Sequence, residues 1–393
     1  MSGKTLAEPQ GVPCYRLGQL VAYMAGLGSW GFGGPVALVG FMYRDLVERR
    51  QWVSEADYKE GMALAQLMPG PLAAQLAIYL GYVHYRVVGA TLAGLAFVLP
   101  SFLMVLGLGV AYRAYGGIAW MQSVFYGVGA SVIGIIAMSA YKLTSKNIGR
   151  DRLLWAICLA SAAVTVITRS EVVWLFLGAG VLVWLLRAPP RPGGRLHGFA
   201  ASAPLLAGAV AAAEWPRLVE IGAFFAYAGS FVFGSGLAIV PFLYGGVVQE
   251  HHWLTDRQFV DAVAVAMITP GPVVITTGFI GYLVAGFWGA VVAALGTFVP
   301  CYLFTILPAP YFKKHGKRPG IVAFVDGVTA AAIGAITGAV IVIGHRSITD
   351  WVTAGLALAS AAALWRFKKL PEPLVVLVAA LVGLLVHPLM AAG

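Results

Sequence analysis

Long apolar runs separated by short polar segments dominate this chain of 393 residues. A helix needs about 20 mostly apolar residues to cross the core of a bilayer, and most of these runs approach or exceed that length. The pattern therefore predicts an all-α polytopic membrane protein with about 13 spans. The candidate spans are residues 17–43, 60–83, 87–112, 117–141, 153–168, 172–187, 199–213, 218–244, 259–283, 287–310, 320–344, 350–365 and 372–391.

Composition narrows the class of protein further. Apolar residues make up 60% of the chain and charged residues 11%, whereas a soluble domain carries about 25% charged residues. A soluble chain so poor in charge could not cover its surface, which excludes a cytosolic enzyme and a secreted disulfide scaffold. The three cysteines lie too far apart for a zinc site or a disulfide framework. Neither a Gly-x-x-x-x-Gly-Lys-Ser/Thr loop nor a nucleophile–base constellation appears. We therefore predict no enzymatic activity, no cofactor and no metal.

The chain also repeats itself. Residues 28–33, Gly-Ser-Trp-Gly-Phe-Gly, return 201 positions later as Gly-Ser-Phe-Val-Phe-Gly, and the Pro-Gly-Pro at 69–71 returns at 270–272. Chance supplies scattered Gly and Ala matches in an apolar chain, but not two such motifs in register. Internal duplication is typical of secondary transporters. The predicted organisation is an N-terminal cytoplasmic segment (1–16), a first transporter repeat (17–195), a connecting span (196–216) and a second transporter repeat (217–393).

The positions of the basic residues predict how the repeats are oriented. With 13 spans and a cytoplasmic N-terminus, 18 Lys and Arg lie inside and 8 outside, whereas removing the 199–213 span leaves 12 inside and 14 outside. Because cytoplasmic loops are enriched in Lys and Arg, we favour 13 spans, an inverted second repeat and a periplasmic C-terminus. The 44–60 loop conflicts with this arrangement, since it holds four basic residues and would lie outside.

Each repeat contains two sequences that interrupt a helix, at 31–35 and 69–71 in the first and at 232–236 and 270–272 in the second. Proline removes an N–H group and clashes with the preceding turn, and glycine permits positive φ. The two breaks of the first repeat lie roughly 12–14 Å from the polar end of their segment, nearly half-way into a core about 30 Å thick. Irregular backbone at that depth is tolerated only where it is buried in protein or lines a cavity. The sequence thus predicts discontinuous helices at the midplane.

The breaks suggest an anion site. Half-helices that start after Pro35 and Pro71 direct N–H groups and positive dipole ends into the breaks, and in an inverted repeat four such ends converge near the midplane. We expect Gly70 and Gly271 to turn the chain and to present their N–H groups to the anion. The alternative is that Gly and Pro only kink packed helices. The candidate binding residues are Ser29, Phe32, Gly33, Gly34, Pro35, Gln66, Pro69, Gly70, Pro71, Gln75, Ser230, Phe233, Gly234, Ser235, Gly236, Thr269, Pro270, Gly271, Pro272 and Thr276.

These motifs resemble those of the chromate ion transporters in their long, two-domain form. Residues 28–35, Trp52 and residues 65–71 resemble the N-terminal signature of that family, and residues 229–236 with 269–272 resemble its C-terminal counterpart. The resemblance covers nearly the whole chain. It implies export of chromate across the bacterial inner membrane, driven by the membrane potential or a proton gradient, and hence chromate resistance.

Some features leave alternatives open. Gly236 and Met267 stand where the first repeat has Pro35 and Gln66, so the two halves differ if these residues touch substrate. Asp326 lies close to the end of a span, and we interpret it as an interfacial acid rather than a proton-coupling carboxylate.

The expected partners follow from the same reasoning. Chromate and sulfate share tetrahedral shape and charge, so the small-molecule partner is chromate or sulfate. Phosphate keeps a proton at neutral pH and should bind a site of donors less well. A transporter of sulfate or another oxyanion and an anion channel are the alternatives. The protein is expected to lie in a lipid bilayer. Nucleic acid is not an expected partner, because the net charge of +10 reflects Lys and Arg that flank the membrane spans. A homodimer is a candidate assembly.

Overall fold

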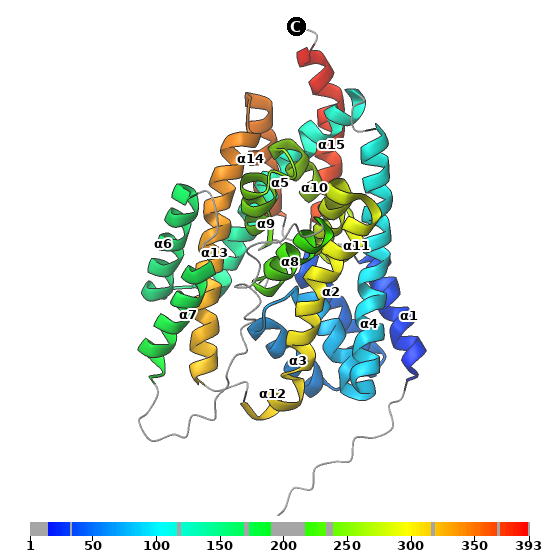
Figure 1. The fold of residues 1–393 in the computed structure, drawn as a ribbon, viewed down its shortest axis with the longest axis vertical. Coiled ribbons are helices and arrows are strands. Elements are labelled where there is room, and N and C mark those ends of the chain that lie inside the picture. The colour runs from blue at the N-terminus through cyan, green and yellow to red at the C-terminus, as the bar shows by residue number, and fades with distance from the viewer. Residues whose placement is uncertain are drawn as a thin grey trace, which may run out of the picture.

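The computed structural model describes residues 15–31, 34–115, 119–168, 173–189, 217–232, 239–315, 319–367 and 370–391. Every regular element in these residues is a helix (Figure 1), which confirms the prediction of an all-α protein. The predicted connecting span 196–216, and segment 1–16 apart from its last two residues, lie outside the described residues. Within the described residues, four helical segments are long and apolar enough to cross a membrane: Leu72–Tyr115, Gln122–Ser145, Val273–Phe312 and Pro319–His345.

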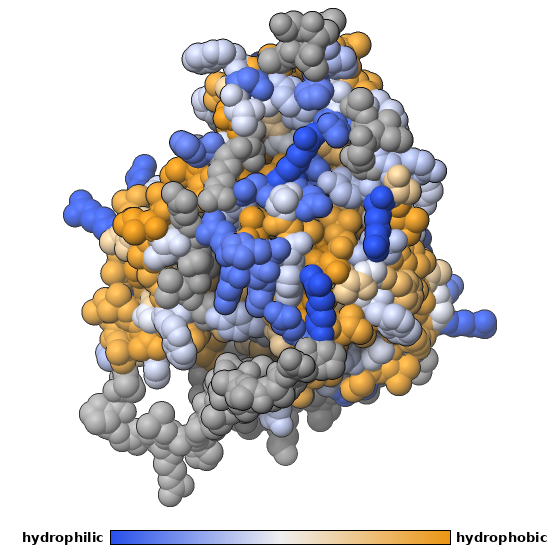
Figure 2. Space-filling view, turned by 45° about the horizontal axis from the view of Figure 1, so that its top comes forward, coloured by the Kyte–Doolittle hydropathy of each residue, from blue (hydrophilic) through white to orange (hydrophobic). Residues whose placement is uncertain are grey.

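Apolar side chains cover much of the molecular surface. In Figure 2, hydrophobic residues spread over the sides of the visible face, while hydrophilic residues gather toward its middle and top. Leu95, Leu99 and Leu103 follow one another at helical spacing and are each more than half exposed. Contiguous exposed apolar surface of this kind fits contact with lipid and not with water. Together with the apolar helices, it indicates a multi-pass membrane protein.

The two repeats contain corresponding helices. The first repeat contains α1 (Leu17–Trp30), α2 (Gly34–Met42), a π-helix (Tyr43–Arg49), α3 (Glu55–Leu67), α4 (Leu72–Tyr115), α5 (Ala119–Asn147), α6 (Arg152–Thr168) and α7 (Val173–Arg187). The second contains α8 (Arg217–Ser230), α9 (Ile239–Leu243), a π-helix (Tyr244–Glu250), α10 (Asp256–Ile268), a 3-10 turn (Val273–Ile275), α11 (Thr276–Ile306), α12 (Ala309–His315), α13 (Pro319–Ser347), α14 (Trp351–Arg366) and α15 (Glu372–Ala391).

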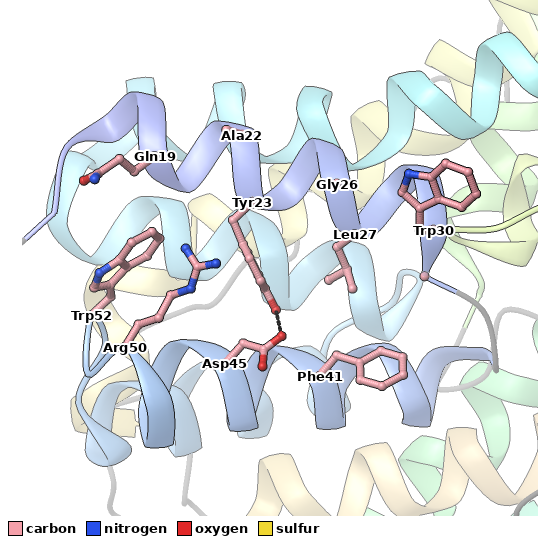
Figure 3. Close-up of a pocket in the computed structure, with 11 residues that line it drawn as sticks. Gln19, Ala22, Tyr23, Gly26, Leu27, Trp30, Phe41, Asp45, Arg50 and Trp52 are labelled. Carbon is pink, nitrogen blue, oxygen red and sulfur yellow. Dashed lines mark hydrogen bonds between the residues drawn. The ribbon is translucent and has the colours of Figure 1, made fainter.

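The chain reverses direction at the first break instead of passing straight through it. Helices α1 and α2 run antiparallel (Figure 3), and the Tyr15 ring before α1 stacks on Trp52 beyond the π-helix, with ring centroids 5.0 Å apart. The prediction of one span over 17–43 is therefore wrong, because these residues form two antiparallel half-length helices. Hydropathy registers removal from water but carries no information on direction, and the Gly- and Pro-rich break lets the chain turn back.

The other breaks are reversals too. Tyr79, after the 69–71 break, donates a hydrogen bond to Glu60 before it (2.7 Å). In the second repeat, the rings of Phe224 and Trp253 lie 5.6 Å apart across the α8–α9 reversal. Tyr112 reaches both Asp261 (2.7 Å) and the Phe279 ring (5.6 Å), which flank the last break. The predicted single spans 60–83, 218–244 and 259–283 are therefore wrong for the same reason as 17–43.

Helix α4 is itself two helices that meet at Arg86, whose φ of 54° and ψ of −141° are not helical. The two parts are antiparallel neighbours, because a Cβ added at Gly81 would lie 2.3 Å from the Gly89 carbonyl oxygen. Helix α11 divides in the same way at Ala285 and Gly286. The predicted boundaries between 83 and 87 and between 283 and 287 are confirmed.

The last helices of each repeat pack on the other repeat. Helix α13 packs against α6 and α7, α5 packs against α14 and α15, and α4 packs against α11. Hydrogen bonds join the exchanged helices, since Ser161 donates to the Ala331 carbonyl (2.7 Å) and Ser123 pairs with His387 (3.0 Å). The buried apolar residues form three clusters, and each of them contains residues of both repeats.

Candidate functional site

The breaks of the two repeats meet in the interior. The Gly70 N–H donates to the Val232 carbonyl (2.5 Å), and the Gly271 N–H donates to the Gly31 carbonyl (3.0 Å). Val232 is the counterpart of Gly31 at the 201-residue offset, so these two hydrogen bonds are equivalent contacts made in both directions. We call this region the crossing. It brings Pro69–Pro71 beside the end of α8 and Pro270–Pro272 beside the end of α1.

Glycine is required at both Pro-Gly-Pro turns. Gly70 has φ of 142° and Gly271 has φ of 96°, in the region that favours glycine. A Cβ at Gly271 would lie 1.9 Å from Ser101 Oγ, and one at Gly70 would lie 2.7 Å from Gln75 Nε2. The expectation that these two N–H groups face the anion is wrong for this conformation, because each is already bonded to a carbonyl across the crossing.

The hydroxyl groups near the breaks are also occupied. Each of the four predicted Ser and Thr donors in the described residues donates to a carbonyl three or four residues earlier in its own segment, a common arrangement for such side chains in helices. In this conformation their protons are not directed at a ligand. The bonds are Ser29 to Ala25 (2.8 Å), Ser230 to Ala226 (2.7 Å), Thr269 to Val265 (2.6 Å) and Thr276 to Val273 (2.7 Å).

The two predicted glutamines have different surroundings. Gln75, on the first turn of α4, is fully buried, and its Nε2 donates to the Pro69 carbonyl (2.8 Å) while its Oε1 has no hydrogen-bond partner among the described residues. Gln66, near the end of α3, is exposed. Gly34 and Pro35 form the first turn of α2. Phe32, Gly33, Phe233, Gly234, Ser235 and Gly236 lie outside the described residues.

A cleft that the sequence did not reveal separates α1 from α2. Its volume is about 580 Å³, and it extends from Gly31 at the crossing to Arg50 and Trp52 at the tip of the hairpin (Figure 3). On α1 its wall is formed by one helical face, at spacings of three and four residues. That spacing was a usable signal. The lining residues are Gln19, Ala22, Tyr23, Gly26, Leu27, Trp30, Gly31, Phe41, Asp45, Arg50 and Trp52.

Charged groups concentrate at the outer end of this cleft. The Arg50 guanidinium carbon lies 4.6 Å from the Trp52 ring centroid and 5.3 Å from that of Tyr23, within cation–π range. Tyr23 points from α1 toward Asp45 (Figure 3), and the hydroxyl-to-carboxylate distance is 3.5 Å. Arg44 and Arg49 also lie 3.5 Å from Asp45. Aromatic faces hold Arg50, whereas the other two arginines neutralise the nearby carboxylate.

The equivalent space in the second repeat is filled by rings. Phe224, the counterpart of Tyr23, packs on Gly246, where an added Cβ would lie 2.1 Å from the ring. Its ring lies 5.5 Å from His251 and 5.6 Å from Trp253, and these two stack on each other at 4.5 Å. His251 also pairs with Glu220 (3.2 Å). Gly246 and His251 stand where the first repeat has Asp45 and Arg50.

Asp326 lies away from the crossing. Its carboxylate is 3.7 Å from Arg187, and its side chain is 43% exposed, which agrees with the interfacial interpretation. Arg187 also pairs with Asp151. Burial acts to raise the pKa of Asp151, but hydrogen bonds from the Leu154 N–H and from Arg187 outweigh it and hold this pKa below its usual value.

Comparison with known proteins agrees with the duplicated architecture. The profile of the chromate transporter family matches residues 18–184 and again residues 219–384. The chain is 71% identical to a chromate transport protein of Cupriavidus metallidurans, over 96% of this chain and 95% of that protein. It is 61% identical to a probable chromate transport protein of Synechococcus elongatus (95% and 96%) and 33% identical to a chromate transport protein of Pseudomonas aeruginosa (94% and 92%). No solved structure matches the chain significantly.

Proposed function

The chain belongs to the chromate transporter family, and we propose that it is a secondary transporter that exports chromate across the bacterial inner membrane and so confers chromate resistance. The names of its relatives support a transporter of chromate and not an enzyme. The observation that carries the proposal is the crossing, where interrupted helices from both repeats meet in the interior. Broken helices at the interface of two repeats are where secondary transporters bind their substrates.

We also propose that the repeats are inverted and that the four pairs of half-helices are re-entrant. In Figure 1, α3 and α12 lie toward the lower end of the molecule and α10 toward the upper end. Replacing four predicted spans by reversals leaves nine of the thirteen predicted segments as crossings of the membrane. Five of these nine precede the second repeat, counting the predicted 199–213 segment, which lies outside the described residues, and this odd count is what an inverted arrangement requires.

The distribution of basic residues supports this topology. Because the hairpin tip returns to the side of Arg16, the basic residues of the 44–60 loop no longer lie outside, and the conflict they caused disappears. Lys and Arg mark the cytoplasmic side, so the lower end in Figure 1 is cytoplasmic. Following the described helices, Arg16, Arg44, Arg49, Arg50, Lys59, Arg86, Lys142, Arg150, Arg152, Arg187 and Arg366 fall on that side, and Arg113, Arg217 and Arg257 fall on the other.

The cleft between α1 and α2 is the proposed cytoplasmic access path. It leads from Arg50, on the basic side, to Gly31 at the crossing. There the N-terminal ends of α2 and α4 offer positive dipole ends to a tetrahedral dianion. The ring-filled space around Phe224 is the closed counterpart on the other side. Exchange of these two states between the repeats carries the anion outward, by the alternating access that inverted repeats permit.

The test is uptake of labelled chromate into inverted membrane vesicles that contain the protein, with and without an imposed gradient. Export from cells corresponds to accumulation inside such vesicles, and we expect accumulation against the chromate gradient when the vesicle interior is made positive. A channel also lets the dianion accumulate, but only up to the Nernst ratio set by the potential. Accumulation beyond that ratio, or accumulation driven by a proton gradient at zero potential, indicates a secondary transporter, and uptake that never exceeds that ratio indicates an anion channel. Uptake of labelled sulfate without chromate indicates a transporter of another oxyanion. Vesicles without the protein provide the baseline.

A further inference from the structure

Asp261 of α10 is a carboxylic acid that the closed outer side of the protein buries. The residue is 4% exposed, and it lies about 9 Å along the helix from Thr255, the N-cap of α10. Every residue of α10 from Phe259 to Met267 is buried with it. Among the described residues it bonds to one group, the Tyr112 hydroxyl, which donates to Oδ2 (2.7 Å), and it forms no ion pair with Lys or Arg. Such burial without a cation beside it favours the neutral, protonated carboxyl group.

The counterpart acid of the first repeat has different surroundings. Glu60 stands 201 positions before Asp261 and is only partly buried, in the repeat whose cleft is open. It accepts a hydrogen bond from Tyr79 of its own repeat (2.7 Å). The second repeat has Phe279 where the first has Tyr79, 200 positions earlier after the loss of one residue. A ring without a hydroxyl group cannot serve Asp261, and Tyr112 supplies the hydroxyl from the other repeat.

Tyr112 closes over the acid from the first repeat. It belongs to α4, and its ring packs against Phe125 of α5 (centroids 5.3 Å apart) and Phe279 of α11 (5.6 Å). The start of α10 is attached to the hairpin that fills the closed outer space, because Tyr244 of the π-helix hydrogen-bonds to Asp256 and its ring lies 5.3 Å from that of Phe259. A movement that opens the space around Phe224 therefore also moves α10 relative to α4.

We propose that Asp261 is a proton-binding site of the outer side, which closes only after this carboxylate has taken a proton from water on that side. The inference rests on the proposed function, since it requires an outer side that opens and closes. Opening separates α10 from Tyr112 and admits water, and the carboxyl O–H bond then breaks as the proton passes to water. Closing forms that bond again before the acid is buried.

The consequence is that transport depends on the pH of the outer side. An aspartate in water is almost wholly ionised near neutral pH, so the fraction that is protonated and ready for burial changes about tenfold per pH unit. Acid on the outer side thus speeds the return of the protein to the state whose cleft is open to the cytoplasm. Glu60, on the inner side, does not meet this water.

Other titratable groups on the elements packed against α10 can also respond to the outer pH. Histidine changes its charge most readily near neutral pH, and His387 of α15 pairs with Ser123 of α5 (3.0 Å) on this side. Arg257, one turn before Asp261 on α10, stays charged throughout. The test must separate Asp261 from these groups, which single substitutions do. The groups near the outer ends are Tyr112 on α4, Tyr126 on α5 with its partner Asp350, Tyr282 on α11, His345 on α13, His387 on α15, and Tyr244 and Glu250 of the π-helix with Asp256.

The experiment uses inverted membrane vesicles, whose lumen corresponds to the outer side. Initial uptake of labelled chromate is measured with the lumen buffered from mildly acidic to mildly alkaline pH, while the bath pH is fixed and the potential is held at zero. For the wild-type protein we expect uptake to fall as the luminal pH rises, by up to about tenfold per pH unit. Asp261→Asn is neutral at every pH, so it should transport chromate down its gradient without dependence on luminal pH. Asp261→Glu keeps an acid and should keep the dependence.

Glu60→Gln is the matched control, since it removes the counterpart acid from the side that luminal water does not reach. Glu60→Gln and His387→Gln should both keep the wild-type luminal pH profile. Tyr112→Phe removes the hydrogen bond but keeps the acid, so it should keep the profile too. If Tyr112→Phe loses the profile as Asp261→Asn does, the pair has only a structural role and the inference is wrong.

Two further results overturn the inference. One is wild-type uptake that ignores luminal pH, which counts even if Asp261→Asn does not fold. The other is an Asp261→Asn protein with the wild-type luminal pH profile. Absence of chromate uptake at every luminal pH by folded wild-type protein contradicts the proposed function itself.

Discussion

The two repeats follow the same chain trace but differ in the space between their first two helices. In the first repeat, Tyr23 and Arg50 line an open cleft of about 580 Å³. In the second, Phe224 lies against Gly246, where no side chain keeps the ring out. The second repeat has Gly246 and His251 where the first has Asp45 and Arg50, and it adds a ring, Tyr227, where the first has Gly26. The Tyr227 ring lies 5.2 Å from that of Phe242, so these changes together accompany a space filled with rings. An open and a closed form of one architecture therefore coexist in a single molecule.

The largest expected effect is an all-or-none difference in sidedness between the two hairpin tips. We expect single cysteines in a cysteine-free background to be labelled in intact cells at Thr255→Cys, and at Ser54→Cys only after the membrane is permeabilised. The physical reason is that each hairpin returns to the side where its first helix begins. Uninterrupted spans give the opposite pattern, with Ser54→Cys alone labelled. Labelling of both positions in intact cells rules out the inverted repeat.

The next comparison concerns the two Pro-Gly-Pro turns. A side chain at either glycine adds backbone strain of about 1–3 kcal/mol, but Gly70→Ala meets the flexible amide of Gln75 whereas Gly271→Ala meets the short side chain of Ser101 at 1.9 Å. We expect Gly271→Ala to lower the amount of protein in the membrane. Gly70→Ala should leave most of the protein in place and lose chromate uptake by tenfold or more.

Immunoblots of membranes and vesicle uptake measure these two quantities. Gly355→Ala, on α14 with open space around its Cβ position, serves as a control that should change neither. If Gly70→Ala transports normally, the turn has only a structural role.

A smaller effect should separate Arg50 from its counterpart in the second hairpin, His251. Arg50→Gln removes the cation at the outer end of the open cleft, so we expect the KM for chromate to rise roughly tenfold, in line with loss of one charge-assisted contact, and to depend less on salt. His251→Gln changes the counterpart position inside the closed space and should alter the KM little. Uptake kinetics at low and moderate ionic strength check both. An equal rise in the two variants would show that the open cleft is not the access path.

The smallest expected effect comes from removing the N-cap of α3 or of α10, a feature that the two repeats share. Ser54 caps α3 by accepting from the Asp57 N–H (3.0 Å), and Thr255 caps α10 by accepting from the Gln258 N–H (3.3 Å). Ser54→Ala and Thr255→Ala should each lower stability by about 0.5–2 kcal/mol, the usual cost of losing a cap, with transport retained. Thermal unfolding in detergent measures this, and Ser54→Asp, which keeps a capping oxygen, is the control. A large effect at one cap only contradicts the equivalence of the hairpins.

Sequence alone determined the class of the protein and the places where its helices fail. Runs of about 20 apolar residues have few other structures open to them, and the repeated Gly and Pro motifs break helices for reasons that lie in the backbone of each residue. The boundary near Arg86 and the need for glycine at Gly70 and Gly271 are local in the same sense. Each of these features depends on residues close together in the chain, so the sequence alone is enough to predict it.

Only the tertiary structure decided what happens at the breaks. Hydropathy cannot distinguish one helix that crosses a membrane from two that reverse, because both remove the same apolar residues from water. The carbonyl that accepts from the Gly70 N–H lies on Val232, in the other repeat, and the unpaired oxygen of Gln75 depends on the Pro69 carbonyl that occupies its amide nitrogen. Likewise, Phe224 fills its space only because Gly246 lies opposite. These outcomes depend on which groups meet after packing, and a linear pattern does not contain that information.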